Sequence, residues 1–241
     1  MDITNDPHSQ HISRQFNQEL ESLKTQLLAM GGLVERQINE VITALLEGDF
    51  EAAERVRDND REVNNFQLDI DDECAHILAR RQPTASDLRL VLAVTRATSD
   101  LERMGDEANK IARHALSLIE EGLTSRGFTE IRHISTRVRD MVRHALTAFA
   151  RMDVPMAREV LGEDEIVDQD YQTAMRSLVT FMMEDPRSIS SVLNVMWILR
   201  SLERIGDHAD NLAESVVYLV EGDDIRHSSS AQPLSDRASG A

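Results

Sequence analysis

The segment LERMGDEANKIA at residues 101–112 returns as LERIGDHADNLA at residues 202–213, with seven of twelve positions identical. A separation of about a hundred residues indicates that the chain contains two copies of one structural unit. Upstream residues repeat as well, at a shift of 104, so that Asp49 corresponds to Asp153. The identical positions keep two acids four residues apart: Glu102 and Asp106 in the first copy, Glu203 and Asp207 in the second.

The first copy is predicted to hold three helices. Apolar residues spaced by three and four between residues 20 and 45 are typical of one buried stripe along a long helix. Asp49 is placed to cap a second helix, which Pro83 ends. Thr84 and Asp87 have the spacing of a capping box for a third helix.

The second copy follows the same plan, with Asp185 predicted to cap the last helix and Pro186 to open it. Low aromatic content and few Gly and Pro also favour helix. The predicted fold class is all-α, with six long helices in two tandem, pseudo-symmetric three-helix bundles. The bundles could be separate or could form one elongated body. The predicted divisions are an N-terminal extension at 1–13, bundles at 14–122 and 123–222, and a disordered tail at 223–241.

The formal charge of −17 argues against a phosphate-backbone ligand, because binding nucleic acid requires a cationic surface. Cations and basic protein surfaces are the expected partners. The single cysteine, Cys74, cannot form an internal disulfide and suits a reducing compartment. The sequence shows neither a signal peptide nor an uninterrupted apolar run of membrane length, so we expect a cytoplasmic protein that reaches membranes only through partners.

Oxygen-bearing side chains should meet where neighbouring antiparallel helices pack. Asp60 lies 23 residues before Pro83 and Asp106 lies 23 after it, which puts the two at one level. The same counting places Asn64 opposite Glu102. In the second copy it places Asp164 opposite Asp207, and Asp168 opposite Glu203. The predicted ligands are Asp60, Asn64, Glu102, Asp106, Asp164, Asp168, Glu203, Asp207 and Asp210.

Carboxylates this close repel one another unless a cation offsets them. Two sources are open: Arg103 and Arg204, one residue along each motif, or a hard metal ion such as Mg, Mn, Ca or Fe. The absence of sulfur ligands and the scarcity of histidine argue against structural zinc. Gly105 and Gly206, costly inside helices, indicate a close approach of backbone, ligand or ion. His208 is expected to be a solvated surface residue.

An enzyme of the ferritin-like di-iron class is an alternative, because Glu73-x-x-His76 and Glu130-x-x-His133 have the spacing of its ligands. The two pairs do not occupy equivalent places in the repeat, and no nucleophile, base or phosphate loop accompanies them. We therefore predict no catalytic activity. A helical scaffold without a ligand, its acids merely solvated, is the second alternative.

The duplicated acidic motif resembles that of the PhoU family, accessory proteins of phosphate transport. The segments HISRQFNQELE from His11, RQPTASDLRLV from Arg81 and SLERIGDHADN from Ser201 are similar to family segments, and the likeness covers about residues 8–222. The resemblance implies metal sites at the acidic motifs, a homodimer, and negative regulation of phosphate uptake and of the phosphate regulon. It also implies two partners, the transporter ATPase subunit PstB and the sensor histidine kinase PhoR. Asn109, where the second copy has Asp210, implies a weaker first metal site.

Overall fold

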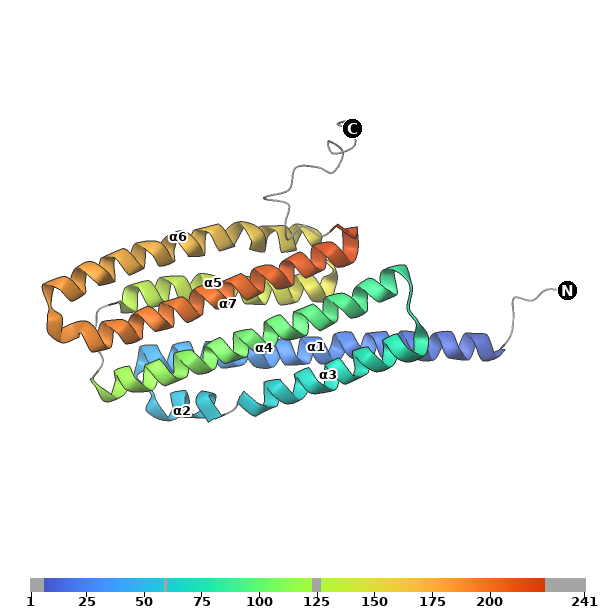
Figure 1. Ribbon diagram of the computed structural model, residues 1–241, viewed down its shortest axis with the longest axis horizontal. Coiled ribbons are helices and arrows are strands. Elements are labelled where there is room, and N and C mark those ends of the chain that lie inside the picture. The colour runs from blue at the N-terminus through green and yellow to red at the C-terminus, as the bar shows by residue number, and fades with distance from the viewer. Residues whose placement is uncertain (1–6, 59, 123–126, 224–241) are drawn as a thin grey trace, which may run out of the picture.

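The computed structural model describes residues 7–58, 60–122 and 127–223, with side chains described in 14–58, 61–122 and 127–223. The all-α prediction is confirmed, and Figure 1 shows the two copies side by side. The second predicted helix is described as two, α2 and α3, on either side of residue 59, which lies outside the described residues. The elements are α1 (Pro7–Glu47), α2 (Phe50–Asp58), α3 (Asp60–Arg81), α4 (Ala85–Glu120), α5 (Phe128–Arg151), α6 (Val154–Glu184), the 3-10 turn η1 (Pro186–Ser188) and α7 (Ile189–Glu221).

The chain ends test the predicted divisions only in part. α1 begins at Pro7, inside the stretch 1–13 that the sequence sets apart as an extension. Of the predicted tail, residues 224–241 lie outside the described residues, as do residues 1–6.

Helix starts agree with the sequence where an aspartate precedes the helix. The Asp49 carboxylate accepts a hydrogen bond from the backbone N–H of Ala52 at 3.0 Å. Its counterpart Asp153 accepts from the N–H of Met156, also at 3.0 Å. Each carboxylate therefore satisfies one of the free N–H groups at a helix start, as an N-cap should.

The predicted capping box at Thr84 is wrong, although α4 does begin there. The Thr84 side chain makes no cap hydrogen bond, and only its backbone oxygen accepts from Asp87, at 3.1 Å. Ala85 has a φ of +45°, so the chain enters the helix through a left-handed residue and the hydroxyl is not carried over the free N–H groups. The prediction that Asp185 caps the last helix is also wrong. Asp185 caps the 3-10 turn, and α7 starts after that turn, at Ile189.

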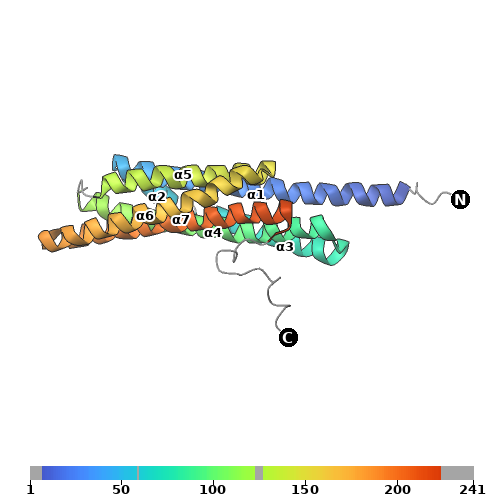
Figure 2. The same cartoon turned by 90° about the horizontal axis from the view of Figure 1, so that it is seen from above.

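The four long helices α1, α4, α5 and α7 form the centre of the molecule. The most extensive contact joins α4 to α7, and α1 packs against both α4 and α5 (Figure 2). The helices α2 and α3 flank α4, while α6 flanks α7 (Figure 1). Buried apolar residues of both copies belong to one continuous core. Of the two arrangements that the sequence leaves open, the copies therefore adopt the single elongated body.

Polar contacts also cross the α4–α7 interface. Glu107 on α4 has a side chain only 2% exposed, and it forms ion pairs with Arg204 of α7 at 2.8 Å and with Lys110 at 2.9 Å. The prediction of a solvated His208 is wrong, because α4 covers that flank of α7. The His208 residue is 7% exposed, and its Nδ1 lies 3.0 Å from a carboxylate oxygen of Asp100.

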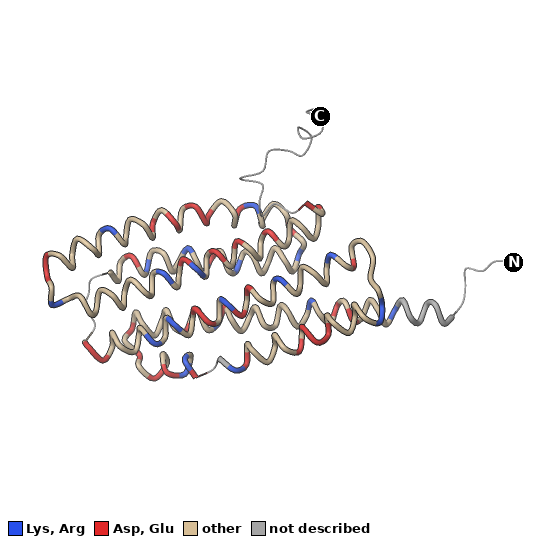
Figure 3. Tube along the Cα trace, viewed as in Figure 1, with Lys and Arg blue, Asp and Glu red and all other residues tan. Residues whose placement is uncertain are grey.

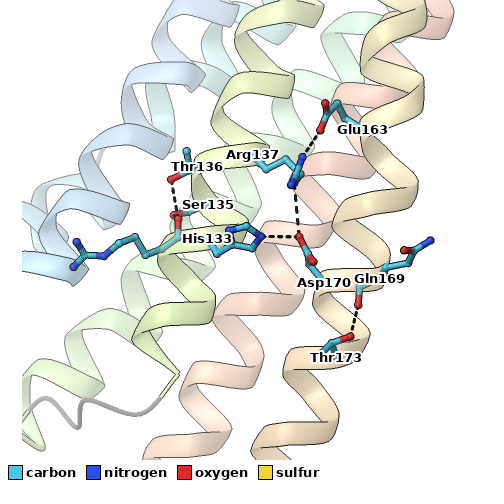
Figure 4. A network of polar contacts seen from close by, with 9 residues as sticks. His133, Ser135, Thr136, Arg137, Glu163, Gln169, Asp170 and Thr173 are labelled. Carbon is cyan, nitrogen blue, oxygen red and sulfur yellow. Dashed lines mark hydrogen bonds and ion pairs between the residues drawn. The ribbon is translucent and has the colours of Figure 1, made fainter.

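The charges of α5 and α6 are opposite in sign. Basic side chains predominate on α5, whereas Figure 3 shows a row of acids along α6. Ion pairs join the two helices beside a groove of about 700 Å³. Asp170 lies 3.1 Å from His133, and Arg137 lies 2.6 Å from Glu163 (Figure 4). None of the helices in the described part of the chain combines the length and apolar character needed to cross a bilayer.

Candidate metal centre

The α6–α7 hairpin gathers carboxylates from two helices. Asp168 of α6 lies with Glu203 and Asp207 of α7 so that one oxygen from each falls within 4.8 Å of the others. The sequence expects Asp168 at the level of Glu203, and the antiparallel turn at residues 185–188 produces that register. Three carboxylates at this spacing can hold one hard cation, since Mg²⁺, Mn²⁺ and Ca²⁺ prefer oxygen ligands.

Two carboxylate oxygens, one in this cluster and one beside it, are buried without a hydrogen-bond partner among the described residues. Glu203 is 8% exposed; one of its oxygens pairs with Arg200, and its Oε2 has no hydrogen-bond partner. The Asp164 Oδ1 is likewise buried and unpartnered. It lies over the backbone of Gly206, where an added Cβ would be 3.7 Å away. Buried polar atoms in proteins nearly always have partners, and these two oxygens could serve as ligands of a cation.

Burial and mutual repulsion raise the pKa values of this cluster. Burial is the main cause for Glu203, whose pKa rises to about 7, with Asp207 the strongest repelling neighbour. Burial is also the main cause for Asp164, whose pKa rises to about 6, and Asp207 is again the neighbouring carboxylate that raises the pKa most. The pKa of Asp207 itself is raised by burial and then by Asp168. The carboxylates are thus held close at a cost that a bound cation would remove.

The acidic row continues along α7 beyond these three residues. Burial raises the pKa of Asp210 to about 7, and Asp164 and Glu214 add to the shift. Glu214 therefore belongs to the row, although it is absent from the predicted ligands. Its position four residues after Asp210, on the same helix face, is the signal that would have included it.

The sequence leaves Arg103 and Arg204 open as cations for the acidic motifs. In the structure Arg204 forms an ion pair with Glu107 of α4. Arg200, one turn earlier on α7, pairs with Glu203.

The two motif glycines do not sit against another backbone. A Cβ on Gly206 would lie 3.6 Å from a methyl group of Val167, and one on Gly105 would lie 3.4 Å from a methyl of Val63. These are side-chain atoms at ordinary contact distances, so the predicted close approach of a backbone is wrong. The approach of a ligand or ion stays a prediction.

Not all of the predicted ligands of the first repeat have described side chains. The side chain of Asp60 lies outside the described residues, so its predicted pairing with Asp106 stays a prediction. Asn64 on α3, and Glu102 and Asp106 on α4, are all partly buried. α3 packs against α4 near this level, as the contact between Val63 and Gly105 shows.

Comparison with known proteins shows which family the chain belongs to. A family model described as the PhoU domain matches residues 27–115 and again residues 131–216. The chain belongs to the PhoU family. The two PhoU domain matches fall within the two predicted bundles, and each contains one acidic motif.

Named relatives agree with the PhoU assignment. The chain is 57% identical to the "Phosphate-specific transport system accessory protein PhoU homolog" of Pseudomonas putida, over 93% of this chain and 88% of that protein. It is 44% identical to the PhoU accessory protein of Escherichia coli K12, over 91% and 90% of the two chains. The crystal structure of PhoU from Pseudomonas aeruginosa is 56% identical, with a TM-score of 0.85 over 86% of this chain and all of that one. The PhoU structure from Streptococcus pneumoniae, described as a phosphate transport system regulatory protein, is 32% identical, with a TM-score of 0.79 over 86% of this chain and 98% of that one.

The ligand pairs of the di-iron alternative are not brought together in this PhoU chain. Glu73 and His76 line a groove between α1 and α3, where Glu73 accepts a hydrogen bond from Gln26. Glu130 and His133 line a separate groove between α5 and α6. Two pairs in different grooves cannot share a di-iron centre, which requires facing helices.

Proposed function

We propose that this protein is the accessory regulator of a phosphate transport system. In this role it restrains phosphate uptake and represses the phosphate regulon, as a cytoplasmic homodimer that links the transporter ATPase PstB with the sensor histidine kinase PhoR. The proposal is supported by relatives with that accessory role in their names, matched over 93% of the chain at 56–57% identity. It contains no covalent step, so the protein acts by binding.

We further propose that the acidic motifs bind a hard divalent cation, such as Mg, Mn, Ca or Fe. One observation carries this part: the Glu203 Oε2 is buried and unpartnered beside Asp168 and Asp207. These residues fit such an ion, because carboxylate oxygens are its preferred ligands and no sulfur is present in the cluster. Bound there, the ion would neutralise the repulsion between α6 and α7.

The chain's own part in regulation is to hold the carboxylates on two neighbouring helices. Without a cation, repulsion favours separation of α6 from α7; with one, the closed hairpin is favoured. A partner that binds one of these arrangements more tightly shifts the population towards it. Cation and partner are then coupled, and the coupling is reciprocal.

Co-purification tests the regulatory proposal. The wild-type chain should retain the transporter ATPase and the kinase from cells grown in high phosphate, and Glu203→Gln/Asp207→Asn should retain less of both. Asp69→Asn/Asp72→Asn is a matched control, because it removes two exposed acids from α3. Failure of the wild type to retain either partner would contradict the regulatory proposal. Equal retention by the motif variant would contradict a role for the acidic motif in it.

A further inference from the structure

The two acidic faces differ at three of six equivalent positions. Asn64 corresponds to Asp168 at the shift of 104, and Asn109 corresponds to Asp210 at the shift of 101. Arg113 stands where the second repeat has Glu214. The first face holds three carboxylates, two amides and one guanidinium, a formal charge of −2, against six carboxylates and −6 in the second. The first set is Asp60, Asn64, Glu102, Asp106, Asn109 and Arg113; the second is Asp164, Asp168, Glu203, Asp207, Asp210 and Glu214.

Both polar atoms of the Asn109 amide are hydrogen-bonded within the protein. Its Nδ2 donates to the backbone oxygen of Arg57 at 2.8 Å, which ties α4 to the end of α2. Its Oδ1 accepts from the Arg113 Nε at 2.9 Å. Asn109 is also only 7% exposed. Turning its oxygen towards a cation would rotate the amide and disturb both of these hydrogen bonds.

Arg113 brings a permanent positive charge to the same face. It follows Asp106 by seven residues, or about two turns, so both side chains project from one side of α4. Its guanidinium is oriented by the bond to Asn109. In the second repeat the equivalent residue is Glu214, which lies on the same face of α7 as Asp207 and Asp210, seven and four residues before it. The same place in the fold therefore opposes a metal ion in one repeat and attracts it in the other.

We infer that the repeats have diverged, so that the second binds the divalent cation while the first, with Arg113 on its face and the Asn109 amide bonded within the protein, binds none. The unpartnered Glu203 and Asp164 oxygens both belong to the second repeat. This disagrees with the sequence prediction of ligands in both repeats: Asn64, Glu102 and Asp106 would be structural acids and amides rather than metal ligands. The inference rests on the proposed cation binding.

Manganese binding distinguishes the repeats, because free Mn²⁺ has an EPR signal that is lost when the ion is bound. Full-length protein, stripped of metal, would be titrated with Mn²⁺ as wild type, as Glu102→Gln/Asp106→Asn and as Glu203→Gln/Asp207→Asn. The wild type and the first-repeat variant should bind the same number of ions with the same affinity. The second-repeat variant should lose at least about tenfold in affinity, since two charged ligands are removed. Far-UV circular dichroism would establish that each variant is folded.

A charge graft adds a gain of function to this test. Asn64→Asp/Asn109→Asp/Arg113→Glu gives the first repeat the ligand set of the second and should create additional Mn²⁺ binding. The inference is overturned if the first-repeat double variant loses bound Mn²⁺, or if a folded graft gains none. If the wild type binds no Mn²⁺ at all, both the proposed cation site and this inference are contradicted. If both repeats bind Mn²⁺, only this inference is contradicted.

Discussion

At the scale of single residues, Glu203 shows how the fold sets the chemistry of a carboxyl group. Glu203 is buried with only one oxygen paired, and its pKa rises to about 7 because burial disfavours the ionised form. An unfolded chain would titrate the same group near 4.5. Between these two values the folded chain holds a proton that the unfolded chain has released.

The sign of the pH dependence follows from this difference. Because the folded state binds more protons between about pH 4.5 and 7, the free energy of unfolding falls as the pH rises through that window. In EDTA, the melting temperature of the wild type should therefore fall from about pH 5 to pH 8, where Glu203 and Asp210 lose their protons.

Glu203→Gln should flatten that decline and raise the melting temperature at pH 8 by a few degrees, since about 1 kcal/mol corresponds to about 2–4 °C in a chain of this size. Differential scanning calorimetry across the pH range measures it. Parallel profiles for wild type and variant would show that Glu203 is not the responsible group.

Sequence alone predicts which residue types face one another in the second repeat, and little about their partners. Asp168 and Glu203 were placed correctly because helix periodicity and the turn position fix their level. His208 was misplaced, and the partner of Arg204 was not predicted, because Asp100 and Glu107 come from the other repeat. No spacing within one hairpin reveals how the two hairpins dock.

At the scale of elements, helix positions follow from apolar periodicity, and helix ends depend on local geometry. Asp49 and Asp153 cap as predicted, whereas Thr84 does not, since a left-handed residue follows it. The crossing of α1 and α5 depends on a feature that periodicity does not contain. A Cβ on Gly31 would lie only 2.3 Å from the Leu146 Cδ2.

Gly31→Ala should therefore destabilise the protein by about 1–3 kcal/mol, because overpacking between α1 and α5 outweighs the helix propensity gained. Gly32→Ala is the matched control: its Cβ would meet only Arg36, at 3.7 Å, so it should be neutral or stabilise by up to about 1 kcal/mol. Urea denaturation measures both. Equal stability of the two variants would mean that Leu146 moves aside without cost.

At the scale of the whole molecule, the α4–α7 interface makes two repeats into one body. Its core is continuous, and Glu107 is buried between the acidic motifs of the two repeats. Removing Arg204 leaves Lys110 as the ion-pair partner of that carboxylate. The interface is thus held by apolar packing and also depends on a paired charge.

Arg204→Ala should lower the free energy of unfolding by about 1–3 kcal/mol, the range for a buried group that loses a partner. Arg103→Ala, at the equivalent and exposed position of α4, should change it by less than about 0.5 kcal/mol. Adding Glu107→Gln to Arg204→Ala should restore part of the loss, and a double-mutant cycle gives the coupling. Similar losses for the two arginine variants would show that the Glu107 pair contributes nothing particular.

The spacing of the acids in the second repeat also determines how the protein responds to the surrounding electrolyte. Their oxygens lie within 4.8 Å of one another, closer than the Debye length of about 8 Å at physiological ionic strength. Dissolved potassium chloride therefore screens their repulsion only weakly. Under the proposed cation binding, an ion of double charge among them would offset the repulsion far more effectively, so the hairpin would respond to divalent ions much more strongly than to monovalent ones.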